Sequence, residues 1–152
     1  MNVFYEFYKI LQHLQQEDVE YALIGGVAMA FYSTPRYTKD IDLLIKEPAL
    51  PAITGIMARE GYLESAQPWT FRESRLTLHR FMKVQDGDDM VVDVLVAGTD
   101  RHLAIIDNAL QAESEGMGTL RVARKDDLMW PKSARNSKQD QADIARLLGE
   151  EG

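Results

Sequence analysis

LIGGVAMAFYSTPRYTKDIDLLI, residues 23–45, places two glycines at the end of one apolar run and two aspartates at the start of the next. Glycine is costly inside ordered structure, and a buried carboxylate is costlier still. The segment predicts a buried strand that ends at the glycines, a short helix over 27–33 that a proline stops, and a second strand over 40–46. We therefore expect these glycines and aspartates to form a site beside two core strands.

The remaining chain alternates between helical and strand patterns. Periodic apolar residues with glycine or proline boundaries predict helices over 3–17, 47–61, 100–112, 125–134 and 138–150. Short apolar runs predict strands over 75–84, 90–96 and 119–123, with a hairpin turn in QDGDD at 85–89. This order predicts an α+β fold: a mixed β-sheet flanked by helices, with C-terminal helices, in one domain covering residues 1–152.

The composition is that of an ordinary globular protein, with 45% hydrophobic and 27% charged residues. The absence of cysteine excludes disulfides and cysteine nucleophiles or metal ligands. The N-terminus lacks the features of a signal peptide, and no stretch approaches the roughly 20 apolar residues of a membrane span. We therefore expect a cytoplasmic protein without a membrane partner. The net charge of −7 argues against broad binding of nucleic acid through its phosphates.

Positive charge is concentrated in residues 119–138. This segment contains six cationic residues but only two acidic ones, Asp126 and Asp127. The cationic residues are Arg121, Arg124, Lys125, Lys132, Arg135 and Lys138. It is where an anionic ligand would be expected to bind, but a solvated helical face explains the same pattern equally well.

Three aspartates stand in apolar strand patterns. Asp40 and Asp42 should share one face of their strand, because side chains alternate along it, and their charges repel unless a cation lies between them. Mg²⁺ (or Mn²⁺) fits, since it binds carboxylates together with phosphate oxygens and water. Asp93, within MVVDVLV, must be paired with a cation or bound to metal to be buried. If its strand lies beside residues 40–46, Asp93 can complete a three-carboxylate site.

The glycines suit the binding of phosphate. Gly25 and Gly26 lie between a strand and a predicted helix, where free backbone N–H groups and the helix dipole favour an anion. A glycine pair alone is more typical of a structural tight turn. The D-x-D motif that begins 14 residues after Gly26 makes the phosphate interpretation much more specific.

These motifs together resemble a known signature. GG-x-A followed by R-x-T-x-D-I-D is similar to the pattern of minimal nucleotidyltransferases of the DNA polymerase β-like superfamily, most closely the AbiEii-type branch of abortive-infection and toxin–antitoxin systems. The matching residues are Gly25, Gly26, Ala28, Arg36, Thr38, Asp40, Ile41 and Asp42. The resemblance continues at VVDVL, which contains Asp93, and in the closing LMWPKSARNSKQDQADIARLL, which contains Lys132.

The resemblance implies a nucleotidyltransferase fold and transfer of a nucleotide from an NTP to an RNA (such as a tRNA end) or a protein. Asp40 and Asp42 would bind metal, and Asp93 would bind metal or help to deprotonate the acceptor hydroxyl. The triphosphate would contact Gly25 and Gly26 and the motif residues Arg36 and Thr38, with Lys132 as a further cation near the phosphates or base. A cognate toxin or antitoxin is a further expected partner. Ion pairing with an acidic neighbour is an equally plausible role for Arg36.

Some features depart from the family pattern. FYSTP replaces the usual His-Gly after the short helix, and the chain has little beyond a catalytic core. These departures keep open an alternative: a catalytically silent module of the same fold that binds a nucleotide or a toxin or antitoxin partner. The three histidines, His13, His79 and His102, are expected at or near the surface rather than as metal ligands, and Trp69 is expected in the core or at its rim.

Overall fold

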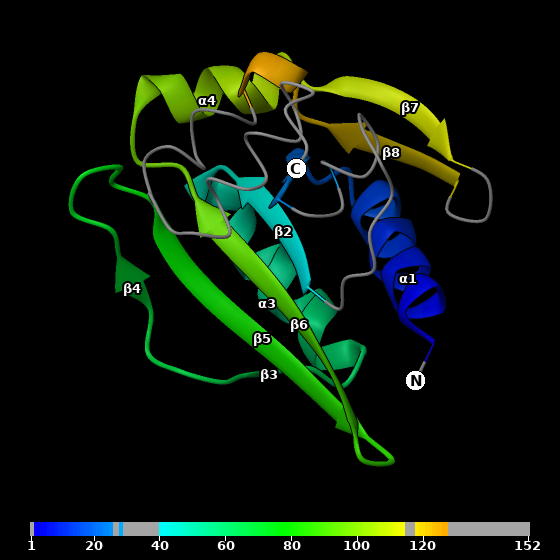
Figure 1. Ribbon diagram of the computed structural model, residues 1–152. Coiled ribbons are helices and arrows are strands. Elements are labelled where there is room, and N and C mark those ends of the chain that lie inside the picture. Colours follow the sequence, from blue (N-terminus) through cyan, green and yellow to red (C-terminus); the bar gives the residue numbers. More distant parts are fainter. Residues whose placement is uncertain (1, 26–27, 29–39, 115–117, 128–152) are drawn as a thin grey trace, which may run out of the picture.

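The structure is a computed structural model that describes residues 2–25, 28, 40–114 and 118–127 (Figure 1). Its helices are α1 (Val3–Gln16), the 3₁₀ turn η1 (Glu47–Ala49), α3 (Leu50–Arg59) and α4 (Asp100–Asp107). Its strands are β1 (Tyr21–Ile24), β2 (Asp40–Ile45), β3 (Leu63–Glu64), β4 (Trp69–Thr70), β5 (Thr77–Gln85), β6 (Asp88–Val96), β7 (Leu110–Ser114) and β8 (Gly118–Val122).

The strands form one mixed sheet in the order β3-β5-β6-β2-β1-β8-β7, with β4 also paired to β5. The pairs β2–β6 and β1–β8 are parallel, and the other pairs are antiparallel. The predicted α+β class and mixed sheet are therefore confirmed. The strand of Asp42 lies directly beside the strand of Asp93, as the proposed three-carboxylate site requires.

Helices α1 and α3 pack together on one face of the sheet, with α3 visible behind β5 and β6 in Figure 1. Their apolar stripes supply much of the core: Phe7, Ile10, Leu11, Leu14, Ile53, Ile56 and Met57. The sheet contributes alternate residues, such as Phe81 and Val92, from the face turned toward α1. Within the described part of the chain, no helix is long and apolar enough to cross a membrane.

The helix predicted over 100–112 is too long. In the structure α4 ends at Asp107, and Leu110–Ser114 pairs with β8 as an edge strand. The strand was missed because its pairing partner, not its own sequence, stabilises the extended conformation. The two-residue strands β3 and β4 were missed for the same reason, since each exists only through its pairing with β5. The predicted helices over 27–33 and 138–150, and most of 125–134, lie outside the described residues.

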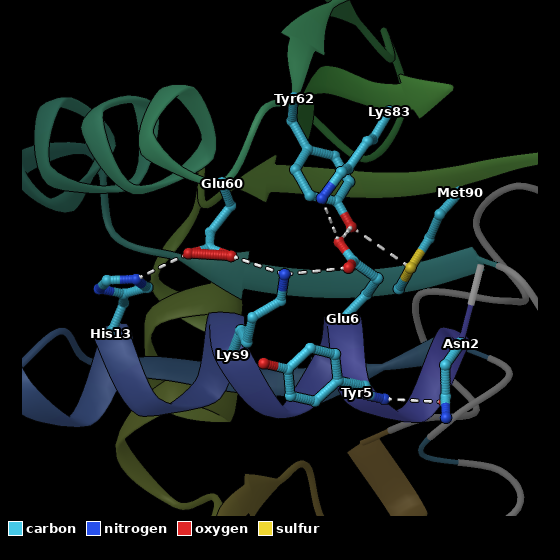
Figure 2. Close-up of polar contacts among 9 residues, drawn as sticks. All are labelled: Asn2, Tyr5, Glu6, Lys9, His13, Glu60, Tyr62, Lys83 and Met90. Carbon is cyan, nitrogen blue, oxygen red and sulfur yellow. Dashed lines mark hydrogen bonds and ion pairs between the residues drawn. The ribbon is translucent and has the colours of Figure 1, made fainter. Parts of the chain in front are cut away.

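A chain of alternating charges joins α1 to α3 and β5 (Figure 2). Glu6 is buried and accepts hydrogen bonds from Lys83 (2.9 Å) and from the Tyr62 hydroxyl (3.1 Å), and it pairs with Lys9 (3.0 Å). Lys9 also contacts Glu60 (3.2 Å). Burial alone would raise the pKa of Glu6, but the hydrogen bonds from Lys83 and Lys9 outweigh it and hold this pKa below its usual value.

His102 occupies a structural position. It was expected at the surface or half-buried, but it is 0% exposed. Its Nδ1 accepts hydrogen bonds from the backbone N–H groups of Gly98 (2.9 Å) and Thr99 (3.2 Å), which closes a capping box at the start of α4. The sequence expectation was wrong because a histidine at this helix position imitates the glutamine or glutamate of the usual box.

Acidification is expected to destabilise the protein through His102. Burial, with the Arg101 charge, lowers the pKa of His102 from 6.5 to about 4. A protonated Nδ1 also cannot accept the two N–H groups. The unfolded chain then binds more protons below pH 6.5, so the free energy of unfolding falls as pH decreases. From pH 7 to pH 5 we expect this residue to contribute a loss of about 2 kcal/mol, measured by urea titration.

The variant His102→Gln provides the control, because glutamine can accept the same N–H groups and does not titrate. Its free energy of unfolding should be nearly constant where that of the wild type declines, whereas His79→Gln should decline like the wild type. Parallel pH profiles for the wild type and His102→Gln would contradict this role.

Candidate functional site

One row of side chains crosses four neighbouring strands. Ile24 of β1 pairs with Asp42 of β2, Asp42 with Asp93 of β6, and Asp93 with Arg80 of β5. Directly paired residues project from the same face of a sheet, and successive residues from opposite faces. Lys83 and Phe81 share one face of β5, and Lys83 contacts Glu6 of α1, so the row of Asp42, Asp93 and Arg80 lies on the opposite face.

Asp42 and Asp93 are both 8% exposed, although both carry carboxylates. Parallel neighbours in register lie about 5 Å apart, so two negative charges are brought close together. Burying this pair is costly unless positive charge compensates it. The sequence predicted this burial of Asp93, and the register adds that Asp42 lies directly beside it.

Arg80 supplies part of the compensating charge. Its Nε donates to Asp93 Oδ1 at 2.8 Å and its second guanidinium nitrogen (Nη2) donates to Asp93 Oδ2 at 3.0 Å. This two-point contact is a strong form of ion pair. The sequence left two explanations open for a buried Asp93: pairing with a cationic residue and binding to metal. The structure contains a pairing partner, Arg80. Sequence reasoning did not identify Arg80 as that partner.

The hairpin carried a signal that could have identified Arg80. Asp86 and Gly87 both have positive φ (53° and 77°), which is the two-residue turn that Asp-Gly favours. Such a turn pairs residue 85 with 88 and, counting outward, residue 80 with 93. Applied to QDGDD, this rule gives the register from the sequence alone.

Gly25 approaches Asp42 closely. It follows β1 with φ = +74°, a left-handed conformation that disfavours residues with a side chain. A Cβ at this position would lie 1.8 Å from Asp42 Oδ2 and 2.7 Å from its Cγ, where no atom fits. The backbone bend and the carboxylate are therefore in direct contact, and this contact requires glycine.

The other predicted site residues are only partly described. Gly26, Arg36, Thr38 and Lys132 lie outside the described residues, and Asp40 is described only by its backbone, which pairs with Val91. Among the described side chains, no group of three histidine, aspartate or glutamate residues is placed to hold a metal ion. Asp42 and Asp93 are thus the predicted ligands that the described structure brings together.

The chemistry of this donor set fits a divalent cation in part. Two carboxylates in register provide the hard oxygen ligands that Mg²⁺ and Mn²⁺ prefer, and the bend at Gly25 leaves no Cβ over Asp42. The oxygens of Asp93 are, however, bonded to Arg80. A cation shared by Asp42 and Asp93 would therefore bind the remaining lone pairs of Asp93, close to the positive charge of Arg80.

The described arginines of the basic segment have structural contacts. Arg121 donates to the backbone carbonyls of Tyr21 (3.2 Å) and Ile106 (2.9 Å), and Arg124 donates to that of Asn108 (3.0 Å). These bonds join β8 to β1 and to the end of α4. Neither the predicted anion site nor the solvated helical face describes Arg121, because it lies in a strand and bonds to backbone.

Trp69 is 64% exposed in β4, at the edge of the sheet, so it belongs to the rim and not to the core. His13 and His79 are partly buried and each contacts a glutamate, at 3.1 Å in both cases. None of these three residues lies in the carboxylate row.

Comparisons with known proteins agree on the fold. No protein-family model and no curated protein matches the chain. Among solved structures, TM1012 from Thermotoga maritima, assigned as a nucleotidyltransferase, is 17% identical with a TM-score of 0.62, over 93% of this chain and 89% of that one. ANT(2″)-Ia, in complex with adenylyl-2″-tobramycin, is 15% identical with a TM-score of 0.60, over 93% and 84%.

A third similar structure is the lincosamide antibiotic adenylyltransferase LnuA with bound lincomycin. It is 14% identical with a TM-score of 0.56, over 95% of this chain and 96% of that one. At these identities the similarity concerns the fold, and the AbiEii-type branch remains a prediction. The chain has the α+β fold of the nucleotidyltransferases.

Proposed function

We propose that this protein is a nucleotidyltransferase that uses Mg²⁺ or Mn²⁺ to move a nucleotide from an NTP to an acceptor. One observation carries the proposal: Asp42 and Asp93 lie in register on neighbouring parallel strands, with the bend at Gly25 pressed against Asp42. Such transfer depends mainly on positioning and on neutralisation of phosphate charge, so it needs carboxylates and close backbone rather than a nucleophilic side chain.

The residues of the site have separate roles in this proposal. Asp42 and Asp93, with Asp40, would hold the cation, and Gly25, with Gly26, would let the triphosphate approach the backbone. When bound, the cation neutralises phosphate charge and activates the attacking oxygen. Arg36, Thr38 and Lys132 complete the nucleotide site in the family pattern, and pyrophosphate leaves as the acceptor oxygen forms its bond to the α-phosphate.

The acceptor that we propose is an RNA, such as a tRNA end, or a protein, such as a toxin or antitoxin partner, as the motif resemblance implies. Two of the structurally similar proteins bind an antibiotic or its adenylylated form: adenylyl-2″-tobramycin in ANT(2″)-Ia and lincomycin in LnuA. An aminoglycoside and a lincosamide are therefore necessary comparison acceptors.

The second candidate function is a catalytically silent module that binds a nucleotide or a protein partner. The contact of Arg80 with both oxygens of Asp93 favours it, because a guanidinium beside this carboxylate repels a metal ion and weakens its binding. The two candidate functions differ in whether the protein transfers a nucleotide from an NTP to an acceptor.

Transfer of label from α-³²P-labelled NTPs tests the proposal. We expect the protein with Mg²⁺ to label an acceptor from one or more NTPs, and Asp42→Asn to reduce the rate about 100-fold or more, because an amide is a poor ligand for a hard cation. Asp86→Asn is the matched control, since Asp86 lies in the exposed hairpin turn and asparagine tolerates its positive φ.

Equal labelling by Asp42→Asn and wild type would dismiss the carboxylate site. Absence of labelling with RNA, protein and small acceptors, together with NTP-dependent thermal stabilisation, would support the silent module instead.

A further inference from the structure

We propose that Arg80 is a positioning residue that holds Asp93 in place without a cation and competes with a divalent cation for its oxygens. This inference rests on the proposed function, because it concerns the same carboxylate site. It adds a residue that neither the sequence motifs nor the resemblance assigns: an arginine on β5 that sets how tightly the site binds its metal.

The first argument is the geometry of the ion pair. Arg80 contacts both oxygens of Asp93, through Nε at 2.8 Å and a second guanidinium nitrogen (Nη2) at 3.0 Å. Each contact takes a lone pair that a metal could otherwise use. Because each carboxylate oxygen has two lone pairs, a cation shared by Asp42 and Asp93 must bind the remaining ones beside the Arg80 guanidinium, which repels it.

The second argument concerns which partner moves. Asp93 lies on β6, between β2 and β5, and its side chain is 11% exposed, whereas that of Arg80 is 48% exposed. The strand pairing on both sides fixes the backbone of Asp93. Arginine has a long side chain, and a half-exposed guanidinium can turn toward water once a cation compensates the buried charge of Asp93. Arg80 is therefore the partner that moves.

The third argument is charge. Asp42 and Asp93 lie side by side and are largely buried, so without a metal they need positive charge nearby. Arg80 provides part of it in the metal-free protein, through its contact with Asp93. A divalent cation provides more, and a guanidinium held against the same carboxylate then repels it. Metal binding and the two-point Arg80–Asp93 contact thus oppose one another.

The test measures the binding of Mn²⁺ to the full-length protein in the absence of nucleotide. The electron paramagnetic resonance signal of free Mn²⁺ reports how much of the ion is unbound. We expect Arg80→Gln to bind Mn²⁺ at least tenfold more tightly than the wild type, and Arg80→Lys to be intermediate, because lysine keeps the charge but not the two-point contact. Thermal unfolding of Arg80→Gln without metal should occur at a lower temperature, and Mn²⁺ should raise it more than in the wild type.

The matched control is Arg59→Gln, which removes the same charge. Arg59 lies on α3 and pairs with Glu17, outside the carboxylate row, so its Mn²⁺ affinity should equal that of the wild type. Equal tightening in both variants would show a general charge effect and overturn the proposal. Should Arg80→Gln fail to fold, Arg80→Lys still decides the outcome.

Further results separate this inference from the proposed function. In one result, Asp42→Asn abolishes the Mn²⁺ binding of the wild type, while Arg80→Gln and Arg80→Lys bind Mn²⁺ no more tightly than the wild type. This result would overturn the role of Arg80 and leave the metal site intact. No binding by any variant would overturn both.

Discussion

Gly25→Ala is expected to reduce the free energy of unfolding by about 2–4 kcal/mol and to reduce nucleotide transfer about 100-fold or more. Two effects combine. Alanine is strained at φ = +74°, and its Cβ would lie 1.8 Å from Asp42 Oδ2, so the carboxylate has to move. Because Asp42 is buried beside Asp93, it cannot move without disturbing the proposed metal site. Urea unfolding and the labelling assay measure the two losses.

Gly87→Ala separates strain from contact. Gly87 has nearly the same φ, +77°, but a Cβ there meets nothing within 4 Å. This variant should lose only the cost of a left-handed alanine, about 1 kcal/mol, and should keep its activity. If Gly25→Ala behaves like Gly87→Ala in both measurements, the contact between the bend and Asp42 has no functional role.

The sequence predicted the centre of the fold because its signals there are local. A D-x-D motif at the start of an apolar run and an aspartate inside MVVDVLV place three carboxylates on two core strands, and the structure contains both strands. The Asp86–Gly87 turn likewise marks a hairpin by its own residues. Each of these features depends on interactions within a few residues.

The missed features have different causes. The strand after α4 exists through its pairing with β8, whereas the contacts of His102 are local and were missed because histidine is not the usual residue of a capping box. Arg80 was not connected with Asp93 because the register of the hairpin was not extended to its side chains. The contact between Gly25 and Asp42 could not be predicted as a distance, although the glycine motif indicated that backbone comes close to a ligand there.

Lys83→Met is expected to cost about 2–4 kcal/mol of unfolding free energy, because it removes one partner of a buried carboxylate. Glu6 is 5% exposed and lies between Lys83 of β5 and Lys9 of its own helix. Methionine keeps the length and packing of lysine but not its charge, so the loss reports the interaction of α1 with β5 (Figure 2). Urea titration at pH 7 measures it.

Lys46→Met is the matched control. Lys46 also contacts two carboxylates, Asp107 at 2.8 Å and Glu20 at 2.9 Å, but both partners are exposed. Exposed pairs contribute little, so the loss of unfolding free energy in Lys46→Met should be much smaller.

The pH dependence gives a second check. Because the folded pKa of Glu6 is lowered below 4.5, its pairing stabilises the protein above that pH and is lost as pH falls through the folded value. The difference between wild type and Lys83→Met should therefore shrink below pH 4.5. A difference independent of pH would mean that Lys83 acts through packing, and equal losses in Lys83→Met and Lys46→Met would show that burial of Glu6 does not strengthen its pairing.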